Sequence, residues 1–489
     1  MMKATLLALF GSLLVSSCGG GSGGGIQCDE SSNCNQHPGG SCDVNPATGN
    51  KWCSYPDPDC ASGRRWSDLD TGDGISGKCT APSDIDASVD GSIADAGDDA
   101  SSMPDAMRSD GGGPITTKLT ASDGEAGDGF GVVGISGDTI VVGAPGDDDV
   151  AQNAGAAYIF VWNSTSSKWE PAPTPKVTAD DGASGDGFGF AVAIDGGHLV
   201  VSNHPPSGGT PSAAYVFEQT IDGFWIQSKK LTSGNTYDTF GSSVAISGST
   251  ILVGAEGDDE AAAGAGAVYI FEREAGVWQP GPTPKLIAPD AAMSRSFGRS
   301  VAIDGTHAAV GSPGTENTAT YLYEKNTTDS TWAAAATARI SGSSGHYYGG
   351  AVDLDGDDLV IASNDIATSD VLHLYRRNTS TGQWLAATVP SFTPSDGQHS
   401  DAFGTSVALD GSQLVAGSPG NDQAGADAGA VYFLTDSGSG SWGPSTTPKV
   451  TAFDPAAADQ FGLHVAADGG RVVVGSPGDT SGAGAIYVY

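Results

Sequence analysis

Acidic side chains are the most numerous groups in this chain that could do chemistry. The 489 residues include 58 Asp and Glu against 21 Lys and Arg, a formal charge of -37. Many aspartates stand before an aromatic-glycine step or after the apolar run that follows it, namely Asp123, Asp128, Asp180, Asp181, Asp147, Asp148, Asp149, Asp258, Asp259 and Asp422. Carboxylates can bind hard cations or attract a basic partner, but Asp also forms turns and keeps surfaces soluble. We favour the turn role, and expect one negative face and no nucleic-acid partner.

Cysteine is the second residue type with chemical potential. Six of the seven cysteines lie close together, namely Cys28, Cys34, Cys42, Cys53, Cys60 and Cys79. An even set in an exported segment with little apolar sequence predicts a module, residues 28–80, held by three disulfides of open pairing. Zinc is the alternative, but the segment has no CxxC pair and His37 is its one histidine. Its residues 68–74 look like part of a calcium loop, although their spacing favours an Asp-rich turn.

The seventh cysteine belongs to an export signal. Lys3 precedes a short apolar run, and Val15-Ser16-Ser17-Cys18 resembles the bacterial lipobox. We therefore expect a lipoprotein signal peptide over 1–17, lipid on Cys18, a Gly-rich tether over 18–27, and attachment to a membrane of the cell envelope. Gly19 after the cysteine favours the outer membrane or cell surface. The alternative is a plain signal peptide that leaves Cys18 as a free thiol.

A linker separates the cysteine-rich segment from the rest. Residues 81–114 are mostly Ser, Asp, Ala and Gly, without periodicity or aromatic residues. Such a composition cannot bury enough apolar surface to fold. We expect an acidic disordered linker that spans roughly 30 Å or more.

Seven copies of one unit must position the loop aspartates. Between 115 and 489 an aromatic-glycine step recurs at Phe130, Phe188, Phe240, Phe297, Tyr348, Phe403 and Phe461, 51 to 58 residues apart. Each step opens an alternating segment, followed by a turn, a second apolar run and an aromatic segment. In six of the units a fourth segment then begins near a tryptophan. Four short strands per unit predict an all-β, seven-bladed β-propeller of four-stranded blades.

The ends of the repeated region indicate how the ring closes. The last unit stops at Tyr489 after its third segment, whereas Thr117-Lys118-Leu119-Thr120-Ala121 resembles the end of a fourth segment. We expect residues 115–121 to pair outside 485–489, so that no open edge separates the first and last blades. The alternative is an open solenoid, which should have distinct capping repeats.

These units resemble the FG-GAP repeats of integrin alpha chains. Phe130-Gly131 with Gly143-Ala144-Pro145 is the fullest match, and the resemblance covers residues 115–489. It implies a propeller whose blades often hold calcium in a DxDxDGxxD loop between the first two strands. Here those connections are tight turns, as at 136–138, too short to surround an ion. We therefore expect no metal or other cofactor; calcium is the one cofactor that the resemblance leaves open.

Nothing in the inner segments suggests a catalytic centre. Arg299 and His464 depart from the pattern there, but they stand in different units and have no evident partner. We expect a non-catalytic binding or adhesion module that recognises a protein or glycan. The alternatives are a propeller hydrolase or lyase with a site in the central funnel, and a structural envelope protein.

Overall fold

The computed structural model describes three short strands between residues 41 and 66, and residues 117–489 except 205–210, 315–317, 343–345, 366–369 and 439. Cys18, Cys28, Cys34, Cys60 and Cys79 lie outside the described residues, as do the expected signal peptide, tether and linker. The chain divides into two compact units, 1–101 and 102–489. Among the described helical segments, none has the length and apolar character needed to cross a membrane.

The first unit contributes one small antiparallel sheet. It consists of β1 (Ser41–Val44), β2 (Lys51–Pro56) and β3 (Arg64–Trp66), in that order. Cys42 and Cys53 stand directly opposite each other on β1 and β2.

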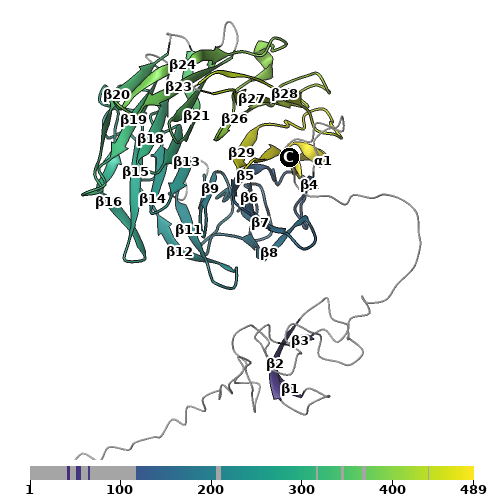
Figure 1. The fold of residues 1–489 in the computed structure, drawn as a ribbon. Helices are drawn as coiled ribbons and strands as arrows, with labels where there is room; N and C mark the ends of the chain where they lie inside the picture. The colour runs from purple at the N-terminus through teal and green to yellow at the C-terminus, as the bar shows by residue number, and fades with distance from the viewer. Residues whose placement is uncertain are drawn as a thin grey trace, which may run out of the picture. The chain divides into compact units, whose positions relative to one another are not determined.

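The second unit is a propeller of seven four-stranded antiparallel blades (Figure 1), as the repeats predict. The innermost strands are β5 (Val132–Ser136), β9 (Val192–Asp195), β13 (Phe240–Ser247), β17 (Ser300–Asp304), β21 (His346–Asp355), β25 (Val407–Asp410) and β29 (His464–Asp468). The second strands are β6 (Thr139–Ala144), β10 (His198–Ser202), β14 (Thr250–Ala255), β18 (His307–Ser312), β22 (Asp358–Asp365), β26 (Gln413–Ser418) and β30 (Arg471–Ser476).

The remaining strands complete each blade toward the rim. The third strands are β7 (Ala156–Asn163), β11 (Ala214–Gln219), β15 (Ala267–Glu274), β19 (Ala319–Lys325), β23 (Val371–Asn378), β27 (Ala430–Asp436) and β31 (Ala485–Val488). The outer strands are β8 (Lys168–Val177), β12 (Trp225–Leu231), β16 (Val277–Leu286), β20 (Trp332–Ser341), β24 (Gln383–Phe392), β28 (Trp442–Val450) and β4 (Thr117–Leu119). Two short helical turns, η3 (His399–Asp401) and α1 (Asp479–Gly482), lie in connections.

The ring closes as predicted. Strand β4 pairs antiparallel with β31 and is the outer strand of the last blade, with Lys118 opposite Tyr487. The first and last segments of the propeller therefore share one sheet, which removes the open edge that a solenoid would have.

Apolar side chains from facing blades form the core. Phe240 and Ile246 of the third blade pack with residues of the second blade, whereas Ala245, on the other face of β13, packs toward Phe297 of the fourth. The bulky face of each of these inner strands thus meets the small-residue face of the inner strand in the preceding blade. The aromatic residue of each step is nearly or fully buried; for example, Phe130 is 0% exposed and meets Tyr158 edge to face at 5.4 Å.

Hydrogen bonds between inner turns join every blade to the next. The last residue of each inner strand accepts a hydrogen bond from the turn glycine N–H of the following blade. Gly196 N–H thus donates to Ser136 Oγ at 3.1 Å, and Gly137 N–H donates to Asp468 Oδ2 at 2.5 Å. The other five bonds join Gly248 to Asp195, Gly305 to Ser247, Gly356 to Asp304, Gly411 to Asp355 and Gly470 to Asp410.

Candidate functional site

The predicted acidic residues lie at one end of the propeller. Each blade is a simple antiparallel meander, so the loop that enters the inner strand and the loop that joins the second and third strands lie at the same end. We call this end the loop face. All ten predicted aspartates belong to these two loop types.

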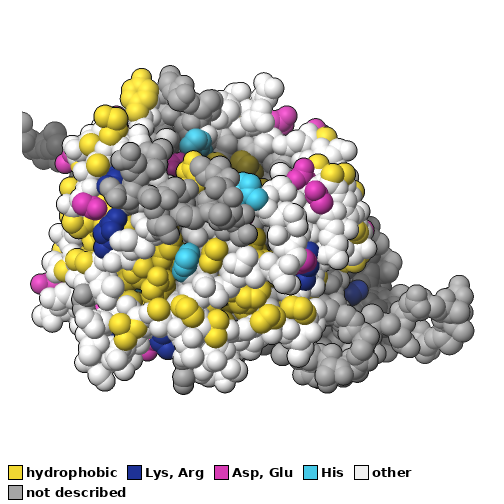
Figure 2. All heavy atoms as spheres, turned by 90° about the horizontal axis from the view of Figure 1, so that it is seen from above, with side chains coloured by type: hydrophobic (Ala, Val, Ile, Leu, Met, Phe, Trp, Pro, Cys, Tyr) yellow, Lys and Arg dark blue, Asp and Glu magenta, His cyan; other side chains and the backbone are white. Residues whose placement is uncertain are grey.

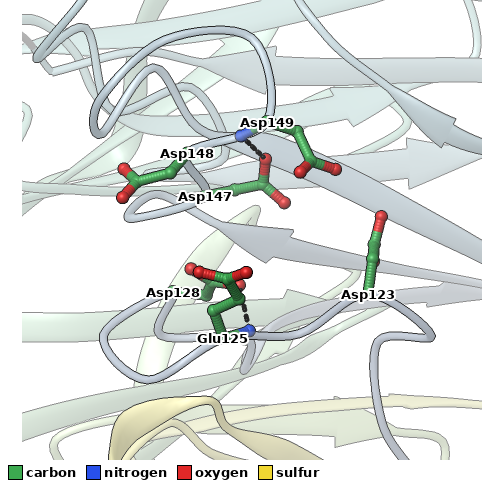
Figure 3. A pocket seen from close by; sticks show the side chains of 6 residues that line it. All are labelled: Asp123, Glu125, Asp128, Asp147, Asp148 and Asp149. Atoms are coloured by element: carbon green, nitrogen blue, oxygen red, sulfur yellow. Dashed lines mark hydrogen bonds between the residues drawn. The ribbon is translucent and has the colours of Figure 1, made fainter.

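Two loops of the first blade form an acidic pocket on the loop face (Figure 3). The pocket has a volume of about 180 Å³ and is lined by Asp123, Glu125, Asp128, Asp147, Asp148 and Asp149. Asp128 is only 5% exposed and accepts a 2.7 Å hydrogen bond from Glu125 N–H. Burial raises the pKa of Asp128, and the nearby carboxylates of Asp147, Asp148 and Glu125 raise it further.

A lysine that the sequence analysis did not single out binds three of these carboxylates. Lys176 Nζ lies 2.7 Å from Asp147, 2.6 Å from Asp149 and 3.0 Å from Asp123. The Tyr158 hydroxyl lies within hydrogen-bond distance of both Asp147, at 2.6 Å, and Asp123, at 2.8 Å, so the two carboxylates share its one proton. The Lys176 ammonium lies 4.9 Å from the Tyr158 ring centre. Burial alone would lower the pKa of Lys176, but these hydrogen bonds outweigh it and the pKa is raised.

The same Tyr–Lys–Asp cluster recurs around the ring. The tyrosine of the third strand faces a lysine of the outer strand, and both bind loop carboxylates, in the sets Tyr215–Lys230–Asp181, Tyr269–Lys285–Asp258, Tyr432–Lys449–Asp396 and Tyr487–Lys118–Asp479. In the fourth blade Arg339 takes the place of the lysine, beside Tyr321 and Asp290. Five lysines and one arginine therefore offset part of the negative charge on the loop face, which remains acidic overall.

The other predicted aspartates mostly shape their own loops. Asp148, Asp259 and Asp422 accept hydrogen bonds from backbone N–H groups five residues further along the chain, at 2.5 to 2.8 Å. Asp180 lies beside Asp181, and its N–H donates to Gln227. Across the described ranges, no three or more His, Cys, Asp or Glu side chains are grouped so as to hold a metal ion.

The fifth blade replaces the cluster with uncharged or weakly basic groups. His373 and Ser391 face each other where other blades have tyrosine and lysine, and Ser341 stands at the position of Asp123. The His373 Nε2 lies 3.0 Å from the Ser363 Oγ, the distance of a nucleophile and its base. Ser363 is only 3% exposed, and its hydroxyl also lies 3.3 Å from the Val371 carbonyl oxygen. Ser363 is thus enclosed by the blade, whereas His373 is half-buried.

Three unusual polar residues lie in or beside the inner strands. Arg299 bonds Glu256 of the preceding blade at 3.1 Å. His464 is half-buried, and the loss of solvent around its ring lowers its pKa to about 4. Asp353 accepts a 2.7 Å hydrogen bond from Leu409 N–H, and burial raises its pKa to about 7. Asp353, like His464, is half-buried.

Large apolar side chains are also exposed on the loop face. Seven of the eleven exposed large hydrophobic residues of the described chain stand in or beside its loops, namely Val150, Phe190, Tyr237, Ile287, Met293, Tyr347 and Phe453. On the side seen in Figure 2, where β20 and β24 lie, acidic and basic side chains are scattered rather than massed. The loop face therefore combines exposed apolar groups with carboxylates that lysines offset only in part.

Comparison with known proteins gives a family match. The model of the FG-GAP repeat matches residues 116–160, 174–217, 225–271, 282–323, 388–434 and 445–489, which together are more than half of the chain; most of the fifth blade falls between matched segments. No curated protein matches the chain.

Solved structures with similar folds include three proteins of low identity. A putative 6-phosphogluconolactonase of Bacteroides fragilis is 12% identical, covers 71% of this chain and 85% of its own, and has a TM-score of 0.45. A protein of Lactobacillus plantarum and a periplasmic gluconolactonase of Pseudomonas aeruginosa are each 14% identical, with 67% and 86% coverage and TM-scores of 0.44.

Proposed function

The chain belongs to the FG-GAP repeat family, and from this premise we propose that its propeller is a non-catalytic module that binds a protein or glycan through the loop face. The observation that carries the proposal is the set of exposed apolar side chains there. Tyr237 and Met293 are 71% and 70% exposed, and Phe453 is 62% exposed. Loops held by a rigid scaffold often carry binding residues.

The charge arrangement supports the same role. Lysines inside the loop face balance several of its carboxylates, for example Lys285 beside Asp258 and Glu260. Protein interfaces commonly combine apolar side chains with polar groups of this kind. We also propose that lipid on Cys18 attaches the module to the cell envelope and that the acidic linker holds it away from the membrane.

Binding by the purified chain to arrays of glycans and immobilised extracellular proteins tests the proposal. A loop-face variant replaces Tyr237, Met293 and Phe453 with serine. We expect this variant to lose at least about tenfold in affinity for any ligand of the unaltered chain, since exposed aromatic and Met side chains often dominate interfaces.

A matched control replaces exposed apolar residues elsewhere, namely Ile221, Ile226 and Leu385, which are 101%, 58% and 48% exposed. This control should bind normally. Equal binding by the loop-face variant and the unaltered chain would contradict the proposal.

A hydrolase is the second candidate, and the contact between Ser363 and His373 is the observation that favours it. Screening the chain against ester and lactone substrates tests this alternative. Activity that the Ser363→Ala variant abolishes would establish the hydrolase and replace the binding proposal.

A further inference from the structure

The small sheet of the first unit places two cysteines directly opposite each other. We propose that Cys42 and Cys53 form a disulfide with each other, whatever the propeller binds. Six cysteines allow fifteen pairings, and this bond leaves only three of them, because the other four cysteines of the segment then pair among themselves.

The register of β1 and β2 carries this assignment. Cys42 is the direct partner of Cys53 in an antiparallel pairing that continues over all of β1 without a shift. Direct partners in antiparallel strands have Cα atoms about 4.5 or 5.5 Å apart, depending on whether they exchange hydrogen bonds. Both values lie within the range of about 4.4–6.8 Å that a disulfide requires between Cα atoms. The paired backbone therefore needs no movement to accommodate the bond.

The local sequence independently favours a hairpin over these residues. Residues 45–50 join β1 to β2 and include Pro46 and Gly49, which are common in turns. Cys42 stands third before this connection, and Cys53 stands third after it. In a hairpin that closes evenly about its connection, residues at equal distances from the connection pair with each other. The sequence and the observed register thus give the same partners.

The size of the sheet explains why it needs a covalent bond. Its strands have 4, 6 and 3 residues, and β2 is the central one. Sheets this small are marginally stable in water, and small exported modules commonly gain stability from disulfides. A bond between β1 and β2 closes the hairpin loop and reduces the number of conformations open to the unfolded chain. The disulfide therefore favours the paired state of the central strand.

Formation of the bond is an oxidation. The two thiols lose two protons and two electrons, and their sulfur atoms form one S–S bond. The electrons pass to an oxidant that contains a disulfide, whose own S–S bond breaks to give two thiols. Such oxidants act in the compartments that exported proteins enter. The export signal expected at the start of the chain leads to such a compartment.

Disulfide mapping of the full-length chain tests the assignment. The chain is isolated from a host that exports it, its free thiols are alkylated, and it is cleaved without reduction before aspartates and after lysines. The cuts before Asp43 and after Lys51 separate the two cysteines, which fall on peptides 29–42 and 52–56. We expect mass spectrometry to find these peptides joined until a reductant is added. Fragmentation between Cys34 and Cys42 should place the bond on Cys42.

Single substitutions provide a second readout. In Cys42→Ser, alkylation of Cys53 should rise from almost none to nearly complete, because its partner is missing. Cys53→Ser should expose Cys42 in the same way. Cys28→Ser is the matched control, in which Cys42 and Cys53 should remain joined and protected from alkylation.

Two results for the unaltered chain would overturn the proposal. One is a bond between Cys53 and any cysteine other than Cys42, and the other is alkylation of both residues. Because the mapping needs no substitution, it decides the question even if a variant fails to fold. Alkylation of Cys53 in Cys28→Ser to the same extent as in Cys42→Ser would also contradict the pairing.

Discussion

The backbone of Gly189 lies against Gly143 of the preceding blade so closely that a Cβ on Gly143 would stand 2.1 Å from the Gly189 carbonyl oxygen. Gly189 has a φ of +98°, which turns its carbonyl toward the neighbouring blade. The same contact joins Gly254 to Gly298, Gly311 to Gly349, Gly417 to Gly462 and Gly475 to Gly131. The glycine near the end of each second strand and the glycine of the next aromatic-glycine step therefore allow neighbouring blades to approach closely.

Substitution of Gly143 by alanine should be strongly destabilising. The new Cβ would meet backbone atoms, which cannot move without shifting a whole blade, so we expect a loss of about 3 kcal/mol or more in the free energy of unfolding. Urea denaturation followed by tryptophan fluorescence measures this loss. Gly137→Ala is the control, because no heavy atom lies within 4 Å of its Cβ position. Gly137→Ala should lower the free energy of unfolding by only about 1 kcal/mol, because alanine is strained at the positive φ of this position. Similar losses for both variants would contradict the contact.

Removal of strand β4 should open the ring. A chain that begins at residue 122 lacks the strand that pairs with β31, and it also loses Lys118 from the cluster of Tyr487 and Asp479. We expect this chain to melt at a lower temperature and to self-associate through the exposed edge of β31. A chain that begins at residue 115 retains the strand and should remain monomeric. Light scattering and differential scanning calorimetry of both chains test the expectation. Equal melting temperatures would show that β4 contributes little to closure.

The number of blades and their closure could be predicted because seven repeats stand in register and the two ends of the repeated region complement each other. The repeat also indicated which inner-strand residues face which neighbour, as for Phe240 and Ala245. Such patterns record packing constraints that recur in every blade, and repetition makes them visible.

The Tyr–Lys–Asp cluster could not be predicted in the same way. Strands β7 and β8 are joined by a turn beside which Asn163 pairs with Lys168. If the pairing continued without interruption from there, Pro173 would stand opposite Tyr158. A bulge between Tyr158 and Phe160 shifts the register, and Lys176 becomes the partner instead. The repeated lysine and tyrosine are visible in the sequence, but their contact depends on this irregularity.

The pH dependence of stability should reveal Asp353. Burial, with smaller effects of Asp355 and Asp304, raises its pKa to about 7 from 3.8. The folded chain then holds a proton that the unfolded chain has lost, so this residue lowers stability progressively as the pH rises from about 4 to 7. The Asp353→Ala variant removes this loss of stability, and alanine is the residue found at the same position in other blades. We expect this variant to be roughly 1–2 kcal/mol more stable than the unaltered chain at pH 8, since partial solvent contact screens the effect.

Urea titrations at pH 8 and pH 5 measure the difference. The advantage of Asp353→Ala should shrink toward pH 5, and Asp353→Asn should behave similarly. An advantage of the same size at both pH values would indicate a packing effect rather than titration.

His464 should produce the opposite slope. Burial lowers its pKa to about 4 from 6.5, so between these values the unfolded chain binds a proton that the folded chain does not. Stability is then complete above pH 6.5 and is lost as the pH falls toward 4. Three other blades have serine at this position, and there Ser243, Ser300 and Ser406 donate to the glycine carbonyl of the next blade. His464→Ser should therefore fold and be less sensitive to acid than the unaltered chain.

The measurement is the free energy of unfolding of His464→Ser and the unaltered chain at pH 7.5 and pH 4.5. On going from pH 7.5 to pH 4.5, we expect the variant to lose about 1–2 kcal/mol less free energy of unfolding than the unaltered chain. The reason is that a desolvated imidazole resists protonation in the folded chain. NMR titration of the His464 ring in the folded chain provides an independent readout of its pKa. A ring that titrates near its ordinary value would mean that solvent or a polar partner reaches it, and the two stability curves would then stay parallel.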